Sequence, residues 1–165
     1  MNSRLSNTAV IAAFTLHNAE EIAFLNRAEL PAELVERFGL IAKVYRQDRM
    51  ALATGILTAF VTVMTDARLA RSGRAGRFVA TAATGALAGN AVNHIMRAVL
   101  QRSYNPGVVT APVLLWAAGR QLLRRVPHQG RRDVAVATAV GNVASVPAIV
   151  LSLWAAYSLT RQSGR

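Results

Sequence analysis

Residues 134–159 read VAVATAVGNVASVPAIVLSLWAAYSL, and this stretch decides the fold. It contains no charged side chain, and most of its residues are aliphatic. A helix of about 20 predominantly apolar residues can cross the hydrocarbon core of a bilayer, because each residue adds about 1.5 Å to its length. The stretch therefore predicts a membrane-spanning helix.

Four further apolar stretches precede this one. Together they predict an all-α fold, an integral membrane bundle of about five transmembrane helices in a single membrane domain. We expect the spans at residues 5–25, 50–67, 78–100, 106–123 and 134–159. The fourth span is predicted to begin with Asn105 as its N-cap and Pro106 at its first helical position. Residues 31–45 have apolar side chains at helical spacing and predict a short helix on the membrane surface, with a longer first loop as the alternative.

The charge of the chain is strongly basic, with 19 Lys and Arg against 8 Asp and Glu and a formal net charge of +11. The basic residues gather in short connections between the apolar stretches, which is typical of loops that orient a membrane protein. The sequence has no aromatic-rich basic segment on which bases would stack, so we expect no nucleic-acid partner. The chain has no cysteine, which excludes disulfides and thiolate metal sites.

Two of these connections predict the orientation in the membrane. The connection between the second and third spans holds Arg68, Arg71, Arg74 and Arg77, and the segment 120–132 holds five more arginines. Both connections lie on the same side of a five-span bundle, and arginine-rich loops stay in the cytoplasm. We therefore expect a multi-pass protein of the cell (inner) membrane, with its N-terminus cytoplasmic and its C-terminus outside.

Small residues at a spacing of four predict helix contacts in the third and fifth spans. Gly85 and Gly89 form a GxxxG pattern in the third span, and Ala137, Gly141 and Ser145 form a similar row in the fifth. Such rows let helices approach closely in lipid.

Polar residues interrupt the first and third predicted spans. His17 lies three and four positions before Glu20 and Glu21, so the three side chains occupy neighbouring positions on a helix. A polar stripe follows the third span at spacings of four, three and four: Asn90, His94, Arg97 and Gln101. A charged group near the bilayer centre costs about 2.5–3.5 kcal/mol on insertion scales, so such residues are usually paired inside the bundle and functional.

The polar residues of the two spans lie at matching depth. Glu20 and Glu21 come 15 and 16 residues after the start of the first span, and His94 comes 16 residues after the start of the third. At about 1.5 Å per residue, both sets lie about 24 Å along helices that run in the same direction. We therefore predict one site between these spans, with Tyr104 above it in the following loop.

Three motifs, taken in order, resemble the HXXEE family of bacterial membrane proteins. HNAEE at 17–21 fits H-x-x-E-E, NAVNH at 90–94 fits N-x-x-x-H, and YNPG at 104–107 fits Y-x-P-G. The resemblance covers roughly residues 10–120. The family has no settled activity, so the resemblance implies which residues matter but not what they do. The residues it implies are His17, Glu20, Glu21, Asn90, His94, Tyr104, Pro106 and Gly107.

The first functional hypothesis is a membrane-embedded enzyme that acts on a lipophilic small molecule by general acid–base chemistry. A carboxylic acid in an apolar bundle favours its neutral form, because desolvation penalises the charged form, and it can donate a proton near neutral pH. A second carboxylate or a histidine can take a proton elsewhere on the substrate, which suits isomerisation, cyclisation or epoxide opening. The candidate catalytic residues are His17, Glu20, Glu21, Asn90, His94 and Tyr104, and the candidate substrate contacts are Arg97 and Asn142.

A metal-dependent membrane enzyme is the alternative. Two imidazoles with one or two carboxylates are adequate ligands for Zn, Fe or Mn, and the candidate ligands are His17, Glu20, Glu21 and His94. Asn90 is then a further ligand or orients His94 from outside the ligand set. Against this reading, the H-E-x-x-H motif is absent, and only two histidines lie in the predicted spans.

Two non-catalytic readings also fit the polar residues. Membrane carboxylates and histidines can relay protons in transport, although five spans without an obvious inverted repeat are not typical of a secondary transporter. Alternatively, His17, Glu21, His94 and Arg97 form an ion-pair network that fixes the register of the helices. The expected partners are the lipid bilayer and a lipophilic small molecule, and the sequence leaves the oligomeric state open.

Overall fold

The computed structural model describes residues 3–25 and 46–162, and within these ranges it is all helical. The helices are α1 (Ser3–Ala23), α4 (Gln47–Met64), the short 3-10 helix η2 (Leu69–Arg71), α5 (Arg74–Gln101), α6 (Ala111–Gln129) and α7 (Arg131–Gln162). The prediction of an all-α fold is confirmed. The predicted surface helix at 31–45 lies outside the described residues.

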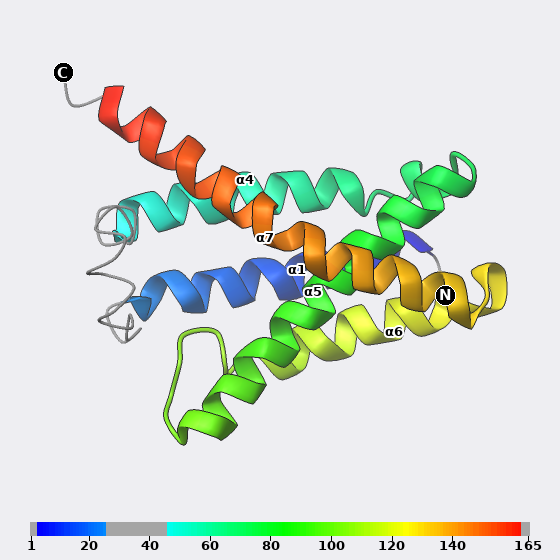
Figure 1. Ribbon diagram of the computed structural model, residues 1–165, viewed down its shortest axis with the longest axis horizontal. Coiled ribbons are helices and arrows are strands. Elements are labelled where there is room, and N and C mark those ends of the chain that lie inside the picture. Colours follow the sequence, from blue (N-terminus) through cyan, green and yellow to red (C-terminus); the bar gives the residue numbers. More distant parts are fainter. Residues whose placement is uncertain (1–2, 26–45, 163–165) are drawn as a thin grey trace.

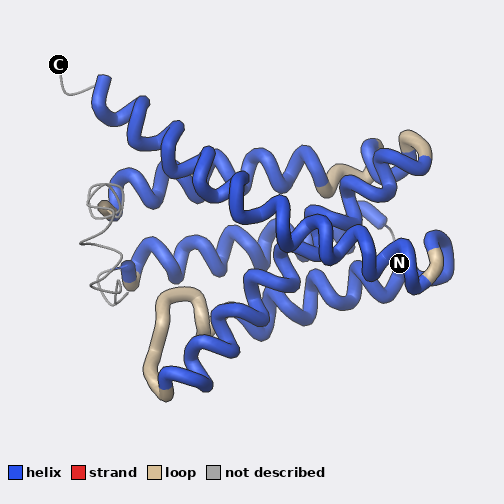
Figure 2. Tube along the Cα trace, in the orientation of Figure 1, coloured by secondary structure: helices blue, strands red, loops and turns tan. Residues whose placement is uncertain are grey.

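The helices form an elongated bundle whose described connections lie at its two ends (Figures 1 and 2). The α5 helix runs diagonally through the bundle and packs against α6 and α7, while α1 packs against α6 and α4, and α4 against α7. This arrangement places α1 and α5 so that the polar residues of both helices face one interior.

The core is built from small and aliphatic side chains of α1, α5 and α6. Val10 and Leu114 are fully buried, and Phe14 and Leu87 are nearly so. Alanines fill the space between these larger side chains, so the helices approach closely enough for polar groups on facing helices to bond directly.

The rows of small residues lie in helix contacts, as predicted, and the structure shows that the rows of α5 and α7 pack against each other. A Cβ added at Gly85 would lie 2.6 Å from the Cα of Thr138, and one added at Gly141 would overlap the backbone oxygen of Ala82. Only glycine allows these backbones to lie so near one another.

The two arginine-rich connections lie at the same end of the bundle. Arg74 at the start of α5 lies 3.9 Å from Asp133 in the first turn of α7, an exposed ion pair that contributes about 0–1 kcal/mol to stability. Arg125, beyond the predicted end of the fourth span, donates from Nη1 to Thr81 Oγ1 at 2.9 Å. Burial lowers the pKa of Arg125 to about 10, so it keeps its charge at neutral pH.

Two segments in the described part of the chain are long and apolar enough to cross a membrane, Gln47–Arg71 and Arg131–Arg161. The finer prediction of five spans is not confirmed for α1, α5 and α6, because polar side chains interrupt their apolar sequences. In α5 these include Asn90, His94 and Arg97.

The start of the fourth predicted span is wrong. That span was expected at 106–123, but α6 begins at Ala111 after Thr110 and continues to Gln129. Asn105 does not cap the helix, because its side chain is bonded to His94. Gly107, with a φ of +94°, then takes the chain through a turn before the helix begins. The other four helices overlap the predicted spans with ends that differ by a few residues.

Candidate functional site

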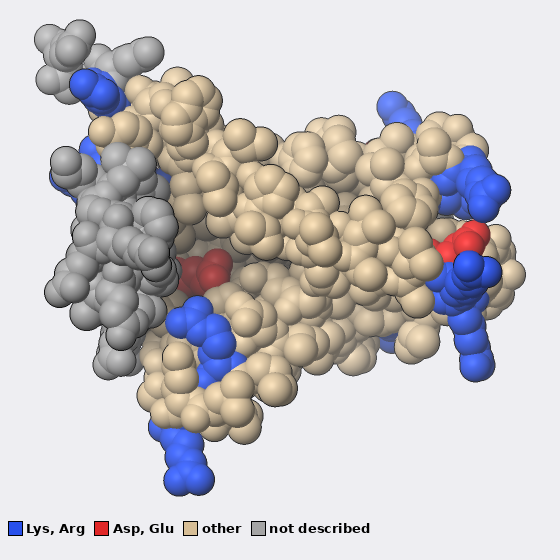
Figure 3. Space-filling view, in the orientation of Figure 1, with Lys and Arg blue, Asp and Glu red and all other residues tan. Residues whose placement is uncertain are grey.

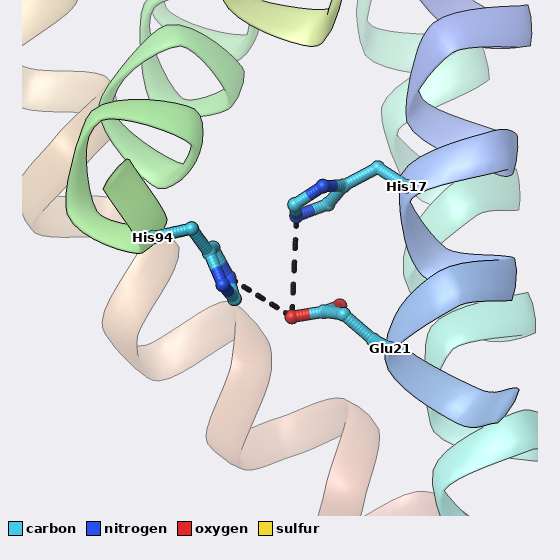
Figure 4. Close-up of side chains that lie close together, drawn as sticks. All are labelled: His17, Glu21 and His94. Atoms are coloured by element: carbon cyan, nitrogen blue, oxygen red, sulfur yellow. Dashed lines mark ion pairs between the residues drawn. The ribbon is translucent and has the colours of Figure 1, made fainter. Parts of the chain in front are cut away.

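Three ionisable side chains from α1 and α5 converge on one point (Figure 4). Glu21 Oε1 lies 3.0 Å from His94 Nε2 and 4.0 Å from His17 Nε2. The two imidazole rings meet edge to face, with centroids 4.7 Å apart. In the described part of the chain, these three side chains form the one group of three or more His, Cys, Asp or Glu residues whose ligand atoms lie within 4.8 Å of one another.

The convergence follows from local helix geometry. His17 and Glu21 are one turn apart on α1, so both side chains point from one face of that helix toward α5. The matching depth of His94 on α5 then places its ring opposite them. His17 is completely buried and His94 is 7% exposed, whereas the Glu21 side chain keeps 22% of its surface exposed. The carboxylate is therefore the member of the group most open to an incoming molecule.

The hydrogen bonds of His17 fix its tautomer. Thr110 has one hydroxyl hydrogen and lies 2.6 Å from Glu20 Oε2, an acceptor, so the hydroxyl donates to that carboxylate. His17 Nδ1, 3.1 Å from the same hydroxyl, must therefore donate to it. The Asn90 amide nitrogen lies 3.0 Å from His17 Nε2, which accepts from it as the unprotonated nitrogen of a neutral ring.

The tautomer of His94 is fixed in the same way by Asn105. The Asn105 amide nitrogen donates to the backbone oxygen of His94 at 3.0 Å, which sets the orientation of the amide. The Asn105 oxygen therefore faces His94 Nδ1 at 2.9 Å, and that nitrogen donates to it. Both histidines use Nδ1 as a donor toward the protein and direct Nε2 toward Glu21.

Glu20, the neighbouring carboxylate, has a different environment. Its Oε1 accepts from the Tyr104 hydroxyl at 2.9 Å and from the Val109 N–H at 3.1 Å. Its Oε2 accepts from the Thr110 N–H at 2.8 Å and from the Thr110 hydroxyl. Four donors match the lone-pair sites of an ionised carboxylate. Glu20 thus ties the 104–110 connection to α1 and faces away from the Glu21 cluster.

Gly107 lets this connection pass close to the cluster. A Cβ at this position would lie 2.7 Å from His17 Cε1 and 3.0 Å from His94 Nδ1. It would also lie 3.1 Å from Glu21 Cγ, and the positive φ adds strain for any L side chain. The glycine of the YNPG motif therefore packs directly against all three ionisable side chains, and a larger residue at this position would displace them.

A cavity of about 1010 Å³ lies between α1, α4, α5 and α7, beside the cluster. Its lining is mostly apolar, with Phe14, Leu57 and Phe60 among the contributing side chains. The polar side chains of the lining include Glu21, Asn90, His94, Arg97 and Gln101 on α1 and α5, and Asn142, Ser145 and Ser152 on α7. Figure 3 shows a hollow on the side of the bundle, with acidic atoms inside it and basic atoms beside it.

The structure separates the residues predicted from the sequence into two groups. His17, Glu21 and His94 contact one another and Asn90 bonds to His17, whereas Glu20 and Tyr104 bond to each other beside them. Arg97 and Asn142 lie on the wall of the cavity and not in the cluster. The Asn142 amide nitrogen also bonds to the Thr138 backbone oxygen on its own helix, at 2.9 Å.

Two residues that orient the histidines do not stand out in the sequence. Asn105 has the sequence signature of a helix cap, and Thr110 lies 93 residues from its partner His17. The signal that would have identified Asn105 is its place between Tyr104 and Pro106, inside a motif that already accompanies His94.

The residues of the site lie within a segment that a protein-family model matches. A family model described as "Protein of unknown function with HXXEE motif" matches residues 8–119, a range that contains the His17–Glu21 stretch, His94 and the 104–110 connection. Neither the curated proteins nor the solved structures contain a match to the chain.

Proposed function

The chain belongs to the HXXEE family, and from this premise we propose that it is a membrane-embedded enzyme that acts on a lipophilic small molecule by acid–base chemistry. The observation that carries the proposal is the Glu21–His94 pair, 3.0 Å apart at the wall of a large and mostly apolar cavity. The family description gives no activity, so the reaction is inferred from the site.

The membrane location is supported by the outer surface of the bundle. Only 17% of the apolar window of α7 is buried inside the molecule, and the corresponding share for α4 is 28%. A core helix of a soluble protein buries most of such a window, and soluble proteins rarely expose large contiguous apolar patches. The large exposed side chains of α7 are Val136, Val140, Val143, Val146, Ile149, Val150, Leu151, Trp154 and Leu159.

The distribution of charge supports the same location and an orientation. In Figure 3 the basic side chains lie toward the ends of the molecule, and the side between them is largely free of charge. Both arginine-rich connections expected from the sequence lie at one end of the bundle, and under the positive-inside rule that end would face the cytoplasm. We therefore place the start of α1 inside and the end of α7 outside the cell membrane.

The cavity supports a lipophilic substrate. A volume of about 1010 Å³ lies at the upper end of the range for sites that bind drug-sized ligands, and a mostly apolar lining with few polar groups is typical of such sites. Arg97 and Gln101 lie along one wall, where they would contact a polar end of the substrate. The hydrocarbon part would then lie against α4 and α7.

The chemistry is assigned to Glu21 and His94. A carboxylate and an imidazole in hydrogen-bond contact can exchange a proton, so one can protonate a substrate atom while the other removes a proton nearby. Such a pair suits an isomerisation, a cyclisation or the opening of an epoxide. His17 and Asn90 hold the pair in place from the opposite side.

The test uses purified protein in lipid nanodiscs, incubated with bacterial lipid extracts and followed by liquid chromatography and mass spectrometry. The wild type should convert at least one lipophilic compound to an isomer or a hydrated product. Glu21→Gln should lower that rate by about 100-fold or more, because it removes a proton-transferring group.

The matched control is Asp133→Asn, the same carboxyl-to-amide change at the basic end of the bundle. It should leave the rate unchanged. Equal rates for wild type and Glu21→Gln would overturn the assignment of the chemistry, and a wild type that alters no compound in any extract would overturn the enzyme proposal.

A further inference from the structure

We infer that His17, His94 and Glu21 form a binding site for one first-row divalent cation such as Zn²⁺, with Nε2 of each histidine and a carboxylate oxygen as ligands. The inference concerns the same site as the proposed enzyme and rests on that function only for what the cation does there: a bound cation would replace the proton between Glu21 and His94 and would activate the group bound to it instead. The binding itself rests on three observations: the spacing of the ligand atoms, the direction of the histidine hydrogen bonds, and the cavity beside them.

The spacing of the ligand atoms fits a cation with bonds of about 2.0–2.1 Å. Ligands placed tetrahedrally at that distance lie about 3.4 Å from one another. Glu21 Oε1 lies 3.0 Å and 4.0 Å from the two Nε2 atoms, and no pair in the group exceeds 4.8 Å. These distances bracket the tetrahedral spacing, so the three atoms already surround one point.

The hydrogen bonds prepare both rings for metal binding. A histidine that binds a metal through Nε2 almost always donates its Nδ1–H to a protein acceptor, which fixes the tautomer and raises the basicity of the ligand. Thr110 accepts from His17 in this way, and Asn105 accepts from His94. A structural ion pair between Glu21 and His94 alone would not require the second ring to be held in the same tautomer and aimed at the same carboxylate.

Asn90 supplies a place for a fourth ligand. In the structure its amide nitrogen lies on the Nε2 lone pair of His17, at 3.0 Å. A half-turn of that amide presents its oxygen instead, and a neutral amide oxygen is an acceptable ligand beside imidazoles. The cation would thus lie between Glu21 Oε1 and the two Nε2 atoms, in place of the Asn90–His17 hydrogen bond and the Glu21–His94 contact.

The composition of the ligand set selects the kind of cation. Two imidazole nitrogens and one carboxylate suit zinc, iron or manganese, whereas calcium and magnesium prefer oxygen ligands only. Glu20 is excluded from the set, because both of its oxygens are occupied by four donors from Tyr104, Val109 and Thr110. Where the Asn90 amide keeps its present orientation, three protein ligands beside the cavity leave the fourth position for water or substrate, as in catalytic sites, and the cation would polarise the group bound there.

The test measures metal binding without any substrate. Full-length protein in detergent is stripped with a chelator, dialysed, and titrated with Zn²⁺ by calorimetry and with Co²⁺ by visible absorption. We expect one equivalent of Zn²⁺ and a Co²⁺ spectrum of low coordination number. His17→Ala, His94→Ala and Glu21→Gln should each weaken binding by at least about 100-fold, and Asn105→Leu, which leaves the ligands intact, by about 10- to 100-fold.

His128→Ala is the matched control, because His128 is exposed near the end of α6 and lies outside the cluster. It should bind one equivalent as the wild type does. Glu21→Gln keeps the size of the side chain and guards against a histidine variant that does not fold. Absence of stoichiometric Zn²⁺ in the wild type, or unchanged binding in folded Glu21→Gln, would overturn the site. Either of these results would leave the Glu21–His94 acid–base pair as proposed, whereas stoichiometric binding would transfer the proton chemistry from that pair to the group that the cation polarises, and substrate conversion is measured separately.

Discussion

Glu20 and Glu21 are chemically identical neighbours whose surroundings differ in almost every respect. Glu20 accepts four hydrogen bonds from the 104–110 connection, whereas Glu21 faces two histidines and a cavity. The first carboxylate therefore has a structural task, and the second is free to take part in chemistry.

This division predicts opposite consequences for the same substitution. In Glu20→Gln the new amide group must face two donors, whichever way it turns, so the free energy of unfolding should fall by about 1–3 kcal/mol. In Glu21→Gln the fold should be nearly as stable as the wild type, while Zn²⁺ binding and substrate conversion are lost. Thermal unfolding in detergent and Zn²⁺ titration measure the two effects. If both variants lose the same stability and the same binding, the two carboxylates do not have separate roles.

The sequence predicted that the polar groups of α1 and α5 would meet, but not which glutamate would face His94. Successive residues point about 100° apart on a helix, so the answer depends on the rotation of α1 about its axis. That rotation is set by the burial of Val10 and Phe14 against α5 and α6. The partners of Glu20 lie about 90 residues further along the chain, so the spacing of residues within one helix could not predict them.

Among the helices, the close contact between α5 and α7 determines the shape of the cavity. Both helices line it, and their backbones meet at Gly85 and Gly141. A change that separates them would widen the cavity and move His94 relative to α1.

We expect Gly141→Ala to lower the free energy of unfolding by about 1–3 kcal/mol, because the added methyl overlaps the backbone of Ala82, which cannot rotate away. Gly55→Ala on α4 is the control, since a Cβ there meets nothing within 4 Å. That change should leave stability unaltered or raise it by up to about 1 kcal/mol, in accord with the higher helix propensity of alanine. Chemical unfolding of both variants in detergent decides the matter, and an equal effect of the two changes would contradict the close contact.

The sequence predicted the helices well where apolar runs or small-residue rows decide the structure. The prediction failed at the start of α6, where the helix-start preference of Asn and Pro competes with the hydrogen bonds that Asn105 makes to His94. Asn105 followed by Pro106 fits a helix start, but the Asn105 side chain is more fully satisfied by the ring and backbone of His94. Such a competition is expected where a turn serves a functional site, because the site constrains the backbone more than the helix does.

For the whole molecule, the proposed orientation can be tested with single cysteines, because the natural sequence has none. Ser103 lies in the exposed turn after α5, and Ser72 lies exposed in the turn after η2 at the arginine-rich end. In intact cells, a membrane-impermeant maleimide should label Ser103→Cys and leave Ser72→Cys unlabelled until the membrane is permeabilised. The reverse pattern would invert the orientation, and labelling of both without permeabilisation would contradict a membrane-spanning bundle.

In the proposed membrane location, the hollow on the side of the bundle would face lipid, and the contents of the cavity would depend on that lipid. A reactant that reaches Glu21 from within the bilayer has a concentration best expressed as a mole fraction in two dimensions, not as a molarity in the cytosol. Each methylene group adds about 0.8 kcal/mol to its partitioning, so long-chain compounds are enriched there before they meet the protein. The cavity would then have to hold its reactant only weakly and release the product by lateral diffusion, which accords with a wide and mostly apolar lining.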